Sequence, residues 1–109
     1  MKDKTKKLLL SLGVMPNLRG FRYLVDAVEM YAERNGDISI TKELYPAIAD
    51  KYGTAAIRVE RNIRHSISKL GDNVPMLEMI HILGMPPSGL TGGYKNSEFI
   101  ALCALKLKE

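Results

Sequence analysis

The hydrophobic and polar positions of this chain follow the period of an α-helix almost throughout. Over residues 17–35 the apolar side chains recur at i, i+3, i+4, i+7, i+10 and i+11, which places them on one stripe of a single helix. They are Phe21, Leu24, Val25, Val28, Tyr31 and Ala32. Only the short segment 38–40, Ile-Ser-Ile, alternates like a strand. The pattern therefore predicts an all-α fold.

Glycines divide this pattern into a compact bundle of about six helices. The predicted helices cover about residues 4–12, 17–35, 41–52, 55–70, 74–83 and 96 (or 97) to the C-terminus. Glycine commonly ends a helix, and one follows each predicted helix except the last: Gly13, Gly36, Gly53, Gly71 and Gly84. Residues 85–95 contain two prolines and three glycines, and we expect them to form an irregular loop.

The starts of the third and fourth predicted helices carry further signals. Thr41 is expected to begin the third helix, and Thr54 is expected to be the N-cap of the fourth. Pro46 falls in or near the first turn of the third helix, where it is tolerated but should distort the start.

Only a Gly-Thr corner separates these two helices, which predicts a helix-turn-helix. Ala49, Gly53 and Val59 have the spacing A-x3-G-x5-V. A small Ala lets the second helix approach the first, and Gly accepts the positive φ that a sharp turn needs. Val59 would pack back into the angle between the helices. The common pattern has a further apolar residue at the position of Asn62, whereas here the apolar residue is Ile63, which suggests a slightly altered turn.

The fourth predicted helix separates an apolar stripe from a basic face. On a helical wheel Ala56, Val59, Ile63, Ile67 and Leu70 form the stripe, and Arg58, Arg61, His65 and Ser68 lie opposite, with Arg64 on the flank. From Arg58 to His65 the helix rises about 10 Å, close to three base-pair steps along a DNA strand. The face therefore has the length and charge to read bases in a major groove.

The residue types on this face suit base recognition. The arginine fork can donate to guanine O6 and N7 together, and a glutamate can accept from cytosine N4. Glu60 would otherwise be unfavourable, because its charge repels phosphate. The alternative is a solvated basic face on which Glu60 and Arg64 form an i,i+4 ion pair. Even on DNA, Glu60 could merely orient Arg64 or Arg61.

Composition sets broad limits on the function. The 109 residues, with a net charge of +4, are enough for one domain and favour an acidic partner only weakly. The single cysteine excludes an internal disulfide, and no apolar run is long enough to span a membrane, so a cytoplasmic protein is expected. The spacing of His65, His81 and Cys103 fits no zinc site, and we expect no cofactor, no metal and no enzymatic activity. His81 is interpreted as a hydrogen-bonded structural residue and Cys103 as a buried thiol.

Residues 40–67 resemble a known family. The elements ITK-x-LYP-x-IA and RVER-x-IRH in this stretch, and NSEFIA at 96–101, are similar to the DNA-binding effector domain of stage zero sporulation protein A, a response regulator of endospore formation. The resemblance covers nearly the whole chain and implies a six-helix fold whose fourth helix enters the major groove of double-stranded DNA. It also implies a TGTCGAA-like element, often in tandem copies.

Carried over by position, the resemblance implies a set of DNA contacts. The base-reading residues fall on Arg58, Glu60, Arg61 and Arg64, with Thr54 and His65 near the DNA backbone. The corner Lys95-Asn96-Ser97 opens the last helix and suggests a phosphate contact, since helix N-termini offer free N–H groups to anions.

Departures from the family leave several expectations open. We expect residues 1–109 to be one effector domain without the family's receiver domain, and residues 75–93 match the family poorly, which leaves contacts with RNA polymerase open. Leu102 and Leu105 lie off the apolar stripe of the last helix, which predicts either burial under the 85–95 loop or head-to-tail self-association on tandem sites. The rival function is a protein-interaction module that binds a regulator or an RNA polymerase subunit.

Overall fold

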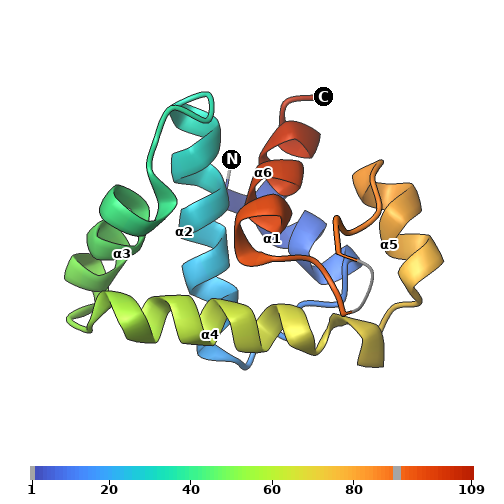
Figure 1. Cartoon of the computed structure of the whole chain (residues 1–109), viewed down its shortest axis with the longest axis horizontal. Helices are drawn as coiled ribbons and strands as arrows, with labels where there is room; N and C mark the ends of the chain where they lie inside the picture. The colour runs from blue at the N-terminus through green and yellow to red at the C-terminus, as the bar shows by residue number, and fades with distance from the viewer. Residues whose placement is uncertain (1, 90–91) are drawn as a thin grey trace.

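The computed structural model describes residues 2–89 and 92–109, and within them the chain is all-helical (Figure 1). The α-helices are α1 (Lys2–Ser11), α2 (Arg19–Glu33), α3 (Tyr45–Tyr52), α4 (Ala56–Ser68), α5 (Met76–Leu83) and α6 (Asn96–Leu107). A π-helical turn, η1 (Ile40–Leu44), leads into α3, and a 3₁₀ turn, η2 (Leu70–Asp72), follows α4. The predicted all-α fold is confirmed.

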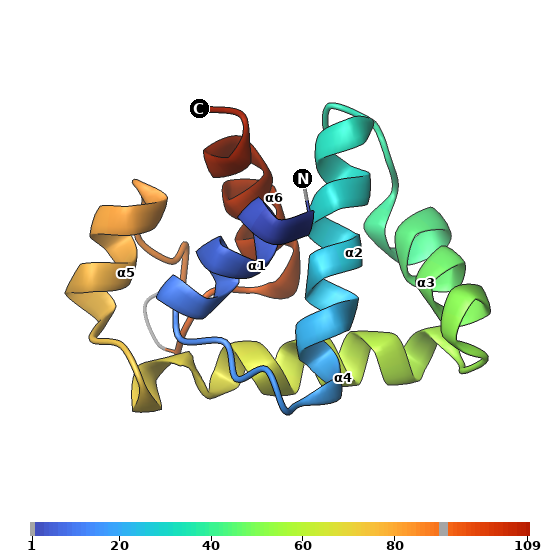
Figure 2. The same cartoon turned by 180° about the vertical axis from the view of Figure 1, so that it is seen from behind.

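α2 is the central helix of the fold. Its N-terminal end rests on α4, and α1, α3 and α6 are arranged around it (Figures 1 and 2). From Tyr23 to Glu29 every residue of α2 is buried. The predicted apolar stripe therefore understates its burial, because other helices cover α2 on several sides.

The segment 38–40, expected to resemble a strand, instead begins a helix. The hydroxyl of Ser39 accepts a hydrogen bond from the N–H of Lys42 at 3.1 Å, and the carboxylate of Glu43 accepts one from the N–H of Ser39 at 2.8 Å. These reciprocal bonds satisfy amides at the helix start. The helical segment consequently begins at η1 rather than at Thr41, and the π-helical geometry of η1 is the distortion expected before Pro46.

The predicted cap of α4 is also wrong. Gly53 has a left-handed backbone with φ of 63°, and the N–H of Thr54 donates to the carbonyl of Ala49 at 2.9 Å. Thr54 therefore closes the end of α3 instead of capping α4. The extended residue before α4 is Ala55, whose side chain makes no capping hydrogen bond.

α4 ends earlier than predicted. Its last residue is Ser68, and the chain then tightens into η2, which contains Gly71. The N–H of Asp72 donates to the carbonyl of Lys69 at 3.1 Å, in the i→i+3 pattern of a 3₁₀ turn. Gly71 is thus part of a turn and does not end α4 itself.

The structure also shows the predicted loop and the surroundings of Cys103 and His81. Residues 85–89 and 92–95 form neither helix nor strand, as predicted, while Leu90 and Thr91 of that loop lie outside the described residues. Cys103 is fully buried, as expected, and this burial raises the pKa of its thiol. The interpretation of His81 was wrong: it is exposed on α5, and its side chain makes no hydrogen bond to the described part of the chain.

α2 crosses α4 at Gly20 with their backbones in contact. A Cβ atom on Gly20 would lie 2.1 Å from the hydroxyl oxygen of Ser66 and 2.3 Å from the carbonyl oxygen of Asn62. The Asn62 carbonyl belongs to the helix backbone and cannot turn aside. Only glycine therefore permits this crossing, which buries Ser66 with no hydrogen-bond partner for its hydroxyl among the described residues.

Partly buried polar contacts attach α3 to α2. The carboxylate of Asp26 accepts hydrogen bonds from Lys51 Nζ at 3.1 and 3.2 Å and from the Tyr52 hydroxyl at 2.6 Å. The ring of Tyr52 also packs edge-on against Tyr23, with centroids 5.2 Å apart. Because Lys51 and Tyr52 end α3, these contacts set the position of the helix that precedes α4.

We predict that Gly20→Ala lowers the free energy of unfolding by about 1–3 kcal/mol or more, because the added methyl overlaps the backbone of α4. Urea denaturation followed by circular dichroism measures the change. Gly71→Ala is the matched control, since its Cβ would meet no atom within 4 Å, and its effect should stay within about 1 kcal/mol. Equal stability of Gly20→Ala and the parent would mean that the helices can separate at no cost.

Candidate nucleic-acid interface

α3 and α4 meet in the arrangement expected of a helix-turn-helix. The left-handed Gly53 turns the chain sharply, and residues 53–55 are the whole connection between the two helices. Ala49 and Val59 are both buried on either side of this corner, as the A-x3-G-x5-V spacing predicts. The corner therefore holds α4 at a fixed angle to α3.

The inner side of α4 anchors it in the core. Val59 and Ile63 are fully buried, and Ile67 is nearly so. Asn62 folds its side-chain amide back to the carbonyl of Arg58 at 2.8 Å, while Ile63, the apolar residue one position later, enters the core. This anchoring leaves the opposite side of the helix exposed to solvent.

The outer side of α4 presents the predicted basic residues together. Arg58, Arg61, Arg64 and His65 are all exposed, and they occupy successive turns of one helix. No ion pair of Arg58 or Arg61 occurs among the described residues, so both guanidinium groups can donate to a ligand. These two arginines and their neighbours form a continuous cationic face.

Glu60 lies at the edge of this face. Its carboxylate is 3.7 Å from a guanidinium nitrogen of Arg64, and its side chain is only 33% exposed. The hydroxyl of Tyr45, from the start of α3, is nearby: burial raises the pKa of Tyr45, and the charges of Glu60 and Arg64 both act on it. Glu60 therefore has an orienting contact with Arg64 and still offers part of its carboxylate to solvent.

The start of α6 is attached to α4 beside Glu60. The side-chain amide of Asn96 donates to the Tyr45 hydroxyl at 3.1 Å and to the backbone carbonyl of Glu60 at 3.2 Å. A single side chain thereby joins α3, α4 and α6. The expected phosphate contact at Asn96 must therefore use its backbone N–H, because the side-chain amide is already bonded within the protein.

Glu98 partly occupies the N-terminal end of α6. Its carboxylate accepts hydrogen bonds from the N–H groups of Lys95 at 2.8 Å and Ser88 at 3.3 Å. Desolvation raises the pKa of Glu98, but these hydrogen bonds outweigh it and the net pKa lies below the usual value. Lys95 and Ser97 remain exposed next to this carboxylate. An anion bound at this corner would share the helix end with Glu98.

Comparison with known families decides what kind of domain this is. The family model described as "Sporulation initiation factor Spo0A C terminal" matches residues 5–107. The chain belongs to this family. Its fold and its exposed basic helix are accordingly those of a DNA-binding effector domain of a sporulation regulator.

The structure of this effector domain adds a residue that the sequence analysis overlooked. Ile57 lies at the N-terminal end of α4 and is 56% exposed, although it is apolar. The signal was present in the sequence, since Ile57 falls off the apolar stripe of the fourth helix.

Within residues 2–89 and 92–109, no helix is both long and apolar enough to cross a membrane.

Proposed function

We propose that this chain is a sequence-specific DNA-binding regulator of transcription that reads a TGTCGAA-like element through α4. The observation that carries the proposal is the exposed row of arginines on α4 in a chain of a DNA-binding family. An α-helix fits the major groove of B-DNA, which is about 12 Å wide. The core residues on the opposite side of α4 would hold this face toward the groove.

Each residue of the interface has a proposed role. Arg58, Arg61 and Arg64 donate to guanine edges or phosphates, and Glu60 accepts from a cytosine N4 group. The DNA backbone contacts are assigned to Thr54, His65, Lys95, Asn96 and Ser97. Ile57 is added as an apolar contact to a thymine methyl group, a pairing that suits an exposed aliphatic side chain.

Truncation of a reading arginine tests the proposal. Arg61→Ala or Arg64→Ala should weaken binding to the preferred duplex by about 1–3 kcal/mol and weaken non-specific binding much less. Fluorescence anisotropy with the preferred and a scrambled duplex at one fixed salt concentration measures both. Arg34→Ala is the control, since this exposed arginine is the C-cap residue of α2, at the opposite end of that helix from its crossing with α4. Parent-like affinity of both test variants would exclude α4 as the reader.

A separate test addresses Glu60. If its carboxylate reads a cytosine, Glu60→Ala should relax the preference at one base pair while total affinity stays similar or rises, because a phosphate-repelling charge is removed. Competition with duplexes changed one base pair at a time measures this. An unchanged preference at every position would leave Glu60 only its contact with Arg64, at 3.7 Å.

We also propose that the domain pairs head-to-tail on tandem sites through α6. Leu105 is 65% exposed and lines a mostly apolar groove with Ala101 and Tyr31, whereas Leu102 packs against the core. Leu105→Glu should abolish cooperative binding to a two-site duplex and spare single-site affinity. Leu77→Glu is the matched control, because Leu77 is 81% exposed on α5. Retained cooperativity in Leu105→Glu would remove α6 from the contact.

The rival function stays a protein-interaction module that binds a regulator or an RNA polymerase subunit. It is favoured by the exposed apolar side chains of Leu77 and Met85, which a domain that contacts only DNA does not require. An electrophoretic shift at two salt concentrations separates the two, since the rival predicts no salt-sensitive complex. A cytoplasmic location and a single effector domain over 1–109 remain predictions.

A further inference from the structure

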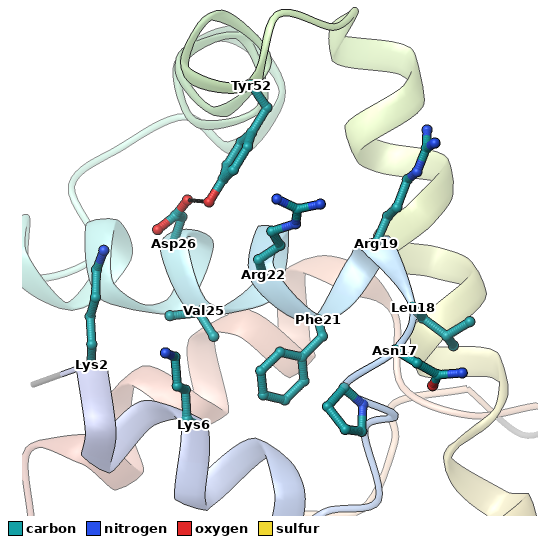
Figure 3. Close-up of a pocket in the computed structure, with 11 residues that line it drawn as sticks. Lys2, Lys6, Asn17, Leu18, Arg19, Phe21, Arg22, Val25, Asp26 and Tyr52 are labelled. Atoms are coloured by element: carbon teal, nitrogen blue, oxygen red, sulfur yellow. Dashed lines mark hydrogen bonds between the residues drawn. The ribbon is translucent and has the colours of Figure 1, made fainter.

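A cationic pocket lies beside the N-terminal end of α2, away from the reading face of α4. It has a volume of about 380 Å³ and lies between α1, α2 and the end of α3 (Figure 3). Four cationic side chains line it: Lys2, Lys6, Arg19 and Arg22. All four are exposed, and none forms an ion pair within the part of the chain that the structure describes.

The one carboxylate of the pocket cannot neutralise these cations. Asp26 is already bonded to Lys51, and it also accepts a hydrogen bond from the hydroxyl of Tyr52, as Figure 3 shows. Arg22 is held over the ring of Tyr52, with its guanidinium carbon 5.5 Å from the ring centroid. This cation–π contact helps to position the arginine and uses none of its N–H groups as hydrogen-bond donors to a carboxylate, so they can donate to a ligand. The pocket therefore has fixed donors and unbalanced positive charge.

The helix end inside the pocket adds to the same field. Arg19 begins α2, a helix of 15 residues, and the N-cap residue Leu18 provides no side-chain hydrogen bond to the first turn. The amides of such a turn and the helix dipole both favour an anion. With two arginines in or next to that turn, the chemistry fits a phosphate group, which accepts bidentate hydrogen bonds from arginine.

The position of the pocket indicates where the phosphate would come from. Arg19 is adjacent to Gly20, which lies against α4 at Asn62 and Ser66. The loop residues Asn17 and Leu18 line this pocket and also a second hollow beside the C-terminal half of α4. That second hollow contains His65 and Lys69, together with the acidic Asp72. The two hollows therefore adjoin at this loop, and the second of them lies along one flank of α4.

We propose that this pocket binds a backbone phosphate of the DNA strand that flanks α4, with Arg19 and Arg22 as the donors. A helix in the major groove has a phosphate strand on each side, and in the proposed complex the two adjoining hollows lie toward one of these strands. Lys2 and Lys6 line the pocket from α1, and in the proposed complex they raise the local potential without touching the DNA. The inference rests on the proposed function, because it requires α4 to enter the groove.

The test combines neutral substitutions with salt dependence. Arg19→Gln/Arg22→Gln should weaken binding to the preferred and to a scrambled duplex by the same several-fold factor. The slope of log affinity against log salt, measured between about 50 and 200 mM, should fall by about 1 for each phosphate that the variant no longer binds. Arg34→Gln is the control and should leave the slope unchanged, because Arg34 is the C-cap residue of α2, at the opposite end from Arg19.

Each other outcome contradicts the proposal in a distinct way. An unchanged slope in the double variant, with its fold verified by a thermal melt, would overturn the phosphate contact. A weakening confined to the preferred duplex would identify base readers instead. Titration of the parent and the variant with inorganic pyrophosphate distinguishes a free anion as the source: loss of pyrophosphate binding with unaltered DNA binding would also overturn the assignment. If the parent itself does not discriminate between the duplexes, the proposed function fails, whereas discrimination with an unchanged slope refutes only the pocket.

Discussion

At Gly20 the backbone of α2 lies against α4 so closely that no side-chain atom fits between the two helices. Close approach of this kind fixes both the distance and the rotation of one helix on the other, because a packed interface has no room for a second arrangement. α2 in turn contacts α1, α3 and α6, so this crossing sets the position of α4 together with the direct contacts of α4 with α3 and α6. The hydroxyl of Ser66 has no hydrogen-bond partner among the described residues, which is a cost of about 1–3 kcal/mol that this geometry tolerates.

Polar contacts then set the orientation that apolar packing leaves open. Asp26 holds the end of α3 on α2, and Asn96 joins the start of α6 to Tyr45 and to the carbonyl of Glu60. Hydrogen bonds are directional, whereas burial of aliphatic side chains is not. The N-terminal half of α4 is therefore aligned by bonds that have defined geometry. A modest net charge of +4 can then attract a polyanion, because the arginines of the outer face of α4 are exposed on the same helix and lie close together.

The sequence by itself determined the helices and the face that carries the arginines. The period of the apolar residues places Val59 and Ile63 inward and Arg58 and Arg61 outward whatever else surrounds the helix, because a helical wheel is a local property. The same local rules misplaced the strand-like segment 38–40 and the cap at Thr54. There, hydrogen bonds to Glu43 and Ala49 overrode the propensity of single residues.

Only the tertiary structure decided which residues meet across helices. The contact of Gly20 with Asn62, the bonds from Asn96 to α4 and the cationic pocket all join residues far apart in the chain. No period or motif encodes such pairings, because they depend on the angles at which whole helices pack. The arginines of α4 were therefore readable from sequence, whereas the arginines of α2 gained a candidate role only when folding placed them beside α4.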